Sequence, residues 1–193
     1  TGPLAGAALV ALGLSSPAAA VTETFLFAGA GGTIGSTASF STSSFSVDVT
    51  ARNLTPPPTG AEVHRNALGL GVRLPGEWGA ERQVDDLHEK DALIFDFGHR
   101  VSIDSVLISA ALPDDRASFV ATNDASVLSA SSVSDVLSLD RSAVENVDGT
   151  WSTVGSGALM GGAYRYLVAA TGGLGTTDKF WKSDGYRIKK LTV

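Results

Sequence analysis

Carboxylates are concentrated in one segment of the sequence, residues 76–98, which read GEWGAERQVDDLHEKDALIFDFG. The acidic residues that precede its alternating strand are Glu77, Glu81, Asp85, Asp86, Glu89 and Asp91. Carboxylate oxygens are preferred ligands of calcium, and a divalent cation would relieve the repulsion among so many acids. We therefore expect a calcium site with Asp85 and Asp91 as ligands. Gln83 or Glu81 would lie close by.

A second interpretation of this segment needs no metal. The acids lack the regular D-x-D-x-D-G spacing of an EF-hand loop. Arg82, His88 and Lys90 lie among them and offset part of the negative charge. A solvated acidic loop between two strands therefore remains the alternative to a calcium site.

Two tryptophans have the surroundings of sugar-stacking residues. Trp78 lies in the acidic segment between glycines, and Trp181 lies near a turn beside Lys179 and Lys182. An exposed indole offers an apolar face for a sugar ring, while nearby carboxylates accept hydrogen bonds from its hydroxyls. We expect glycan contact at Trp78 or Trp181. The alternative is that tryptophan rings fill the ends of the core, which we prefer for Trp151.

No residue pattern singles out a catalytic centre. Glycoside hydrolysis needs two acids facing each other across the sugar, and no pair stands out in this sequence. His64, His88 and His99 lack metal-ligand spacing, and each lies near a loop or strand end, where a histidine is ordinarily exposed to solvent. The G-x-S-x-G sequence of a nucleophile elbow is absent. The sequence therefore favours a protein that is not an enzyme.

The elements that position these residues follow a two-residue period. In SFSVDVTAR, Val47 and Val49 alternate with polar residues, and in ALIFDFG, Leu93, Phe95 and Phe97 do the same, which places Ile94 and Asp96 on the opposite face. Turn signals recur about every ten residues, and strands do not alternate with helices. This pattern predicts an all-β fold, a β-sandwich with jelly-roll-like antiparallel topology.

Two segments depart from this alternation. Residues 28–37 are rich in glycine, and we interpret them as a flexible loop or a sheet edge, because no Lys-Ser/Thr and no helix pattern follow as in a phosphate-binding loop. Residues 126–148 are polar and weakly periodic, which predicts a long loop or an irregular strand pair. Either segment could take part in strand exchange between copies of the chain.

Composition limits the function further. The net charge is −6, from 20 acidic and 14 basic residues, and the basic residues are scattered. Binding to nucleic acid or to an anionic membrane surface is therefore disfavoured. The sequence contains no cysteine, which excludes disulfides, thiolate metal sites and cysteine nucleophiles.

The first twenty residues have the features of an export signal. Residues 4–14 form an apolar run that is shorter than the ~20 residues of a membrane span. Ala18-Ala19-Ala20 provides a small-x-small cleavage site, after which Val21 would begin the mature chain. We interpret residues 1–20 as a signal peptide truncated at its N-terminus; the alternative for this segment is a buried N-terminal helix. We interpret residues 21–193 as a single β-sandwich domain.

Several phrases of the chain occur in an order found in one bacterial family. They are GLGV at residues 69–72, Gln83, Val84, Asp85, Asp91, Leu93, Phe97, residues 101–106 and YRIKKLTV at residues 186–193. In this respect the chain resembles bacterial PEP-CTERM proteins, which exosortases sort to the cell surface. The resemblance implies a secreted or surface-attached protein of an exopolysaccharide-producing bacterium and no known catalytic residues. The family's Pro-Glu-Pro motif, apolar helix and basic tail would begin after Val193, so membrane attachment is expected only through that anchor.

Together these features predict a non-catalytic component of the extracellular matrix, of a biofilm or of envelope adhesion, stabilised by Ca²⁺. The alternatives are a carbohydrate-binding module for exopolysaccharide and, third, a secreted glycan hydrolase. The expected partners are extracellular polysaccharide, other surface proteins or further copies of this chain.

Overall fold

A computed structural model describes residues 22–76, 83–85, 89–109, 115–139, 141–148, 153–154, 162–171 and 185–193. The predicted signal peptide lies outside these residues. So do Glu81, Trp78, Trp151 and Trp181.

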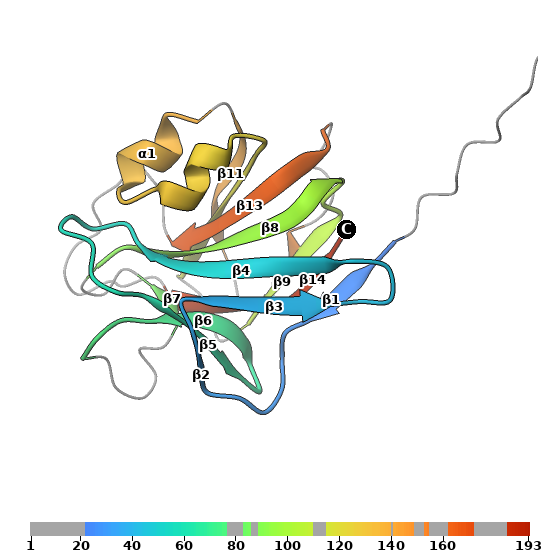
Figure 1. Cartoon of the computed structure of the whole chain (residues 1–193), viewed down its shortest axis with the longest axis horizontal. Helices are drawn as coiled ribbons and strands as arrows, with labels where there is room; N and C mark the ends of the chain where they lie inside the picture. Colours follow the sequence, from blue (N-terminus) through green and yellow to red (C-terminus); the bar gives the residue numbers. More distant parts are fainter. Residues whose placement is uncertain are drawn as a thin grey trace, which may run out of the picture.

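Within this part of the chain, two antiparallel sheets pack face to face (Figure 1), which confirms the predicted all-β sandwich. The eight-stranded sheet consists of β1 (Thr24–Leu26), β2 (Thr33–Gly35), β5 (Glu62–Asn66), β6 (Gly69–Arg73), β7 (Val84–Asp85), β9 (Ser105–Ser109), β12 (Thr153–Val154) and β14 (Gly185–Thr192). The six-stranded sheet consists of β3 (Thr37–Ser41), β4 (Ser46–Asn53), β8 (Asp91–Val101), β10 (Arg116–Thr122), β11 (Arg141–Asp148) and β13 (Tyr164–Thr171). The finer prediction of jelly-roll connectivity stays a prediction.

Long-range pairing builds both sheets. The six-stranded sheet has the order β11-β10-β13-β8-β4-β3, so β8 lies between two strands that are distant from it in sequence. In the other sheet β14 pairs with β6 and β9, and also with β1 and β7. The last strand of the chain thereby holds the eight-stranded sheet together.

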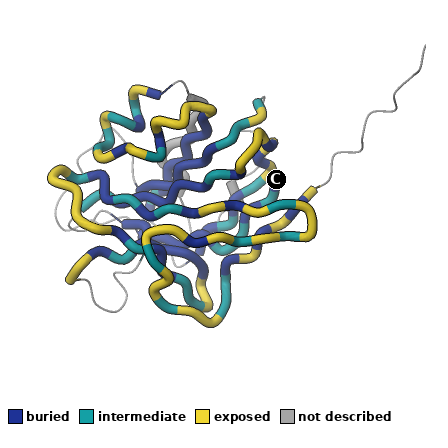
Figure 2. Tube along the Cα trace, in the orientation of Figure 1, coloured by how far each residue is buried: buried dark blue, intermediate teal, exposed yellow. Residues whose placement is uncertain are grey.

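The main core lies between the sheets, and its residues follow the predicted alternation. Val47, Val49, Leu93 and Phe95 are fully buried, as expected for the inward positions of β4 and β8. From the other side Phe27 packs against Phe95, with ring centroids 5.7 Å apart. Figure 2 shows the buried residues along the strands and the exposed ones at hairpin tips and loops.

A helical layer covers the outer face of the six-stranded sheet, and this corrects the prediction for residues 126–148. Instead of a loop or a strand pair, the segment contains the 3-10 helix η2 (Ala125–Ser129), the α-helix α1 (Val133–Leu137) and then β11. Figure 1 shows α1 on the outer side of this sheet, and Val136 of α1 shares an apolar cluster with Tyr166 and Val168 of β13. Val127 and Val136 pack with Ile94 into a second apolar cluster, which explains why that outward residue is fully buried. None of the helices within the described ranges has the length and apolar character needed to span a membrane.

One close contact between strands requires glycine. Gly69, at the start of β6, has a φ of +131°, and a Cβ atom there would lie 2.3 Å from the carbonyl oxygen of Ile188 on β14. Such a distance is far below van der Waals contact, and the backbone conformation is unfavourable for other residues. Gly69, the first glycine of the GLGV phrase, therefore lets the β6 and β14 backbones approach each other.

The two ends of the sandwich carry different groups. At one end, Asn53 at the end of β4 pairs with Asp91 at the start of β8, beside Asp85. We call this end the acidic pole. At the other end the backbone N–H of Glu23 donates to Val193 O at 2.8 Å, and Val193 N–H donates to Glu23 O at 3.0 Å. We call this end the terminal pole, because the N-terminal and C-terminal ends of the described chain meet there.

Candidate functional site

The acidic pole brings together three of the four predicted calcium ligands. Asp91 Oδ1 accepts a hydrogen bond of 2.8 Å from the backbone N–H of Asp85. Asp91 is fully buried and Asp85 is 5% exposed. The carbonyl oxygen of Gln83 accepts a hydrogen bond from Val72 N–H at 3.0 Å, which fixes the entry to β7. The fourth predicted ligand, Glu81, lies outside the described residues.

A buried phenol lies beside this carboxylate. Tyr186 is fully buried, and its hydroxyl donates to the carbonyl oxygen of Ala170 at 2.9 Å, which links β14 to β13 across the core. Burial, and after it the negative charge of Asp91, raises the pKa of Tyr186 well above its usual value. Asp91 therefore lies inside the domain next to a neutral phenol, in a structural rather than a solvent-facing position.

The described residues do not by themselves form a metal site. No group of three or more histidine or acidic side chains within these ranges is arranged to hold an ion. A calcium site built on Asp85 and Asp91 needs further oxygen ligands, for which the sequence offers Glu81. Calcium binding at the acidic pole stays a prediction.

Another acid of the segment fixes a neighbouring loop. Glu89 accepts hydrogen bonds from the side-chain amide of Asn53 and from Thr59, the latter at 3.1 Å. Asn53 is 2% exposed, its amide also donates to Thr59 at 2.7 Å, and its oxygen accepts from Thr55 N–H at 2.8 Å. Asn53 has the spacing of an N-glycosylation acceptor, but its amide is engaged in these contacts in the folded domain.

A two-point ion pair lies on the outer face of the six-stranded sheet. Arg165 Nε and Nη2 donate to the two carboxylate oxygens of Asp96 at 2.9 and 3.0 Å, and Gly98 N–H also donates to Asp96 at 2.8 Å. Burial opposes ionisation of Asp96, but these hydrogen bonds outweigh it and lower the pKa of its carboxyl. The guanidinium also lies 5.0 Å from the ring centre of Tyr166. This cluster joins β8 to β13.

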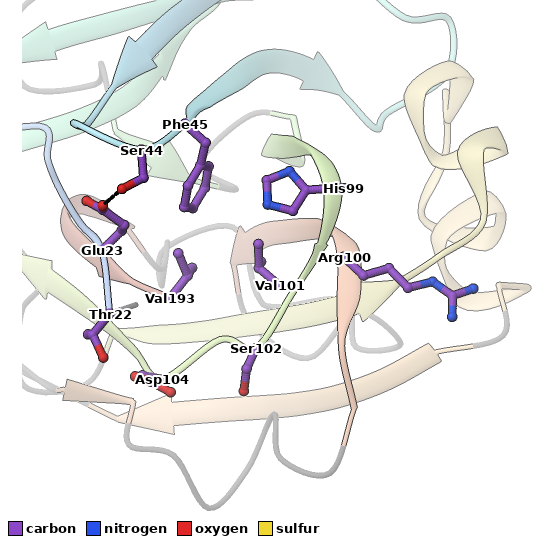
Figure 3. A pocket seen from close by; sticks show the side chains of 10 residues that line it. All are labelled: Thr22, Glu23, Ser44, Phe45, His99, Arg100, Val101, Ser102, Asp104 and Val193. Atoms are coloured by element: carbon purple, nitrogen blue, oxygen red, sulfur yellow. Dashed lines mark hydrogen bonds between the residues drawn. The ribbon is translucent and has the colours of Figure 1, made fainter. Parts of the chain in front are cut away.

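A pocket of about 450 Å³ opens at the terminal pole (Figure 3). Its lining comes from four separate parts of the chain: Thr22, Glu23, Ser44, Phe45, His99, Arg100, Val101, Ser102, Asp104 and Val193. The volume is within the range of small-molecule sites. No prediction from the sequence pointed to this place, because no local spacing connects these residues.

The walls of the pocket are fixed by contacts among its own residues. Glu23, which is 8% exposed, accepts hydrogen bonds from the hydroxyls of Ser44 and Ser43, the latter at 3.3 Å. The hydrogen bond from Ser44 lowers the pKa of Glu23; burial acts in the opposite direction, and the hydroxyls of Thr42 and Ser43 add to the lowering. The lining therefore contains an ionised carboxylate of fixed position.

An aromatic pair forms the opposite wall. The rings of Phe45 and His99 meet edge to face, with centroids 5.0 Å apart and an angle of 75°. Phe25 supports Phe45 from the core side at 5.4 Å. This arrangement puts apolar and charged surface into one concave site, as ligand-binding pockets commonly do.

The histidines occupy different places. His99 is exposed beside the pocket, as expected, whereas His64 is 6% exposed within β5, so the expectation of solvent exposure is wrong for that residue. Its strand lies inside the eight-stranded sheet between β2 and β6, which removes it from solvent. His88 lies outside the described residues.

Comparison with protein families, with curated proteins and with solved structures finds no match to this chain. The resemblance to PEP-CTERM proteins therefore stays an expectation from the sequence.

Proposed function

We propose that this chain is a non-catalytic secreted or surface-displayed protein that contributes to the extracellular matrix of a biofilm or to envelope adhesion. The observation that carries the proposal is that acidic side chains at the acidic pole hold neighbouring parts of the chain in place. Asp91 holds the backbone of Asp85, and Glu89 holds Asn53 and Thr59. Groups that have the chemistry of catalysts or ligands are engaged in fixing the connections between strands.

The leader-like residues 1–20 and the resemblance to exosortase-sorted proteins support export and display. A rigid sandwich is also a suitable unit for a matrix, since its loops and edges carry contacts while its core stays unchanged. Its partners in this proposal are extracellular polysaccharide, other surface proteins or further copies of the chain.

Gene deletion and complementation in the source organism test this function. We expect deletion to reduce surface adhesion or biofilm mass, and a gene encoding wild-type protein or Gly60→Ala to restore it. A gene encoding Gly69→Ala should fail, because that substitution disrupts the β6–β14 contact. Unchanged adhesion after deletion would contradict the proposal, and so would polysaccharide cleavage by the purified protein.

Carbohydrate binding is the second candidate. Trp78 precedes β7 and Trp181 precedes β14, and these two strands pair through Gly185 and Asp85. The strands that follow the two tryptophans are therefore neighbours at the acidic pole. A glycan array tests this candidate: saturable binding that is lost in Trp78→Ala or Trp181→Ala and kept in the matching phenylalanine variant would favour a carbohydrate-binding module.

A further inference from the structure

The terminal-pole pocket contains the negatively charged carboxylate of Glu23. Glu23 is more than nine-tenths buried, and the side chains that donate to its carboxylate, Ser43 and Ser44 with a contribution from Thr42, are neutral hydroxyls. Within the described residues it forms no ion pair. Hydroxyl groups stabilise a carboxylate but leave its charge in place, so a cation that reaches the pocket gains a strong electrostatic contact.

The basic side chains of the lining lie apart from this carboxylate. Asp104 adds a second acid to the same pocket. In Figure 3 the side chain of Arg100 extends away from Glu23, and the His99 ring lies on the far side of Phe45. The side of the pocket near Glu23 is therefore acidic.

The rest of the lining suits an alkyl chain. Figure 3 shows Phe45, Val101 and Val193 between the carboxylate and the imidazole. These side chains offer apolar surface next to the charge, and an ammonium group near an aromatic ring gains a further cation–π contribution. A sugar would present neutral hydroxyls to Glu23 and would leave its charge uncompensated.

We propose that the terminal-pole pocket binds an alkylammonium group, with the cation on the carboxylate of Glu23 and the alkyl chain along Phe45 and Val193. This is the chemistry of a lysine side chain of another protein and of a free polyamine. The pocket volume of about 450 Å³ accommodates either of them. The proposal is independent of the adhesive function.

NMR titration of the isotope-labelled protein tests this proposal with three probes: cadaverine, N-acetyl-lysine methylamide and its neutral norleucine analogue. We expect the two amines to shift the amide signals of Ser44, Phe45 and His99 saturably in the millimolar range. The norleucine analogue should bind at least about tenfold more weakly, because it lacks the charge.

Two substitutions test whether amine binding depends on Glu23 itself or on the overall negative charge of the protein. Glu23→Gln should weaken amine binding at least about tenfold. Glu62→Gln removes an acid that pairs with Arg73 elsewhere at 2.9 Å and should leave binding unchanged. An unchanged spread of amide signals in Glu23→Gln shows that this variant is folded, so that a loss of binding reports the missing charge.

The source of the amine is distinguished by a lysine-containing peptide. Tighter binding of the peptide than of N-acetyl-lysine methylamide indicates a protein partner, and equal binding indicates a small amine. The proposal is overturned if the amines cause no saturable shifts, if the norleucine analogue binds as tightly as they do, or if Glu23→Gln binds as wild type does.

Discussion

The carboxylate of Asp91 accepts a hydrogen bond from the backbone N–H of Asp85, 2.8 Å away, while Asp91 itself is fully buried. A buried carboxylate is costly unless hydrogen bonds compensate for its lost hydration. The contact ties the start of β8 to β7, and β7 in turn pairs with β14. One acid of the carboxylate-rich segment thus connects the two sheets.

Asp91→Ala should destabilise the domain, because it leaves the backbone N–H of Asp85 without its acceptor and opens a cavity where the buried carboxylate was. We expect the free energy of unfolding to fall by about 2–4 kcal/mol, as measured by urea denaturation. Asp91→Asn retains an acceptor oxygen and should lose less. Glu62→Gln, in an exposed ion pair with Arg73, is the control and should cost below about 1 kcal/mol. Equal losses in the Asp91 and Glu62 variants would refute the structural role.

Calcium should raise the melting temperature if the predicted site exists. An ion that binds only the folded state at a hundred times its Kd adds about 2.7 kcal/mol to stability. The measurement compares melting in millimolar calcium and in chelator. Gln83→Ala and Asp85→Asn should reduce the shift, whereas Asp48→Asn on the outer face of β4 should not. Identical melting curves with calcium and with chelator would exclude the site.

Gly69→Ala should be among the most damaging small substitutions in the chain. The added methyl group would lie 2.3 Å from Ile188 O at a φ of +131°, so β6 or β14 must shift. We expect a loss of at least about 2 kcal/mol in urea denaturation. Gly60 has no atom within 4 Å of the equivalent position, so Gly60→Ala is the matched control and should be close to neutral. A stable Gly69→Ala protein would contradict the observed strand contact.

The ion pair between Asp96 and Arg165 predicts a pH dependence of stability. Because the folded-state pKa of Asp96 lies below its ordinary value of 3.8, its contribution is present above that value and is lost as the pH falls through the folded-state pKa. At neutral pH Asp96→Asn should cost about 1 kcal/mol, since Arg165 is partly exposed. The difference from wild type should shrink in acid.

Urea denaturation at a series of pH values measures this effect. Asp48→Asn is the control: Asp48 lies directly opposite Asp96 on β4 and accepts a hydrogen bond from Ser39, without an ion pair to Arg165. A loss in Asp96→Asn that stays constant with pH would show that the charge of Asp96 is not responsible.

The sequence was sufficient to predict the sheets but not the layer that covers them. Val47, Val49, Leu93 and Phe95 follow a two-residue period, so their burial could be predicted from spacing. The same spacing places Ile94 outward, yet it is buried beneath η2 and α1. Helices of five residues each are too short to produce a visible helical period, and their serines are typical of loops.

Of the two candidate sites, one could be predicted from the sequence and the other could not. Gln83, Asp85 and Asp91 are close in sequence, so their proximity at the acidic pole could be expected. Glu23 and His99 line one pocket only because β1 and β4 begin, and β8 and β14 finish, at the same pole. That juxtaposition depends on long-range strand order, which a single sequence does not encode in its local pattern.

Export and display are the central claim of this account, and mass spectrometry of the protein made by its source cell tests them most directly. The culture medium and the cell-surface fraction are compared with the cell interior. We expect the protein outside the cell with a mature N-terminus at Val21. Recovery of the chain only inside the cell, with residues 1–20 still attached, would contradict the account.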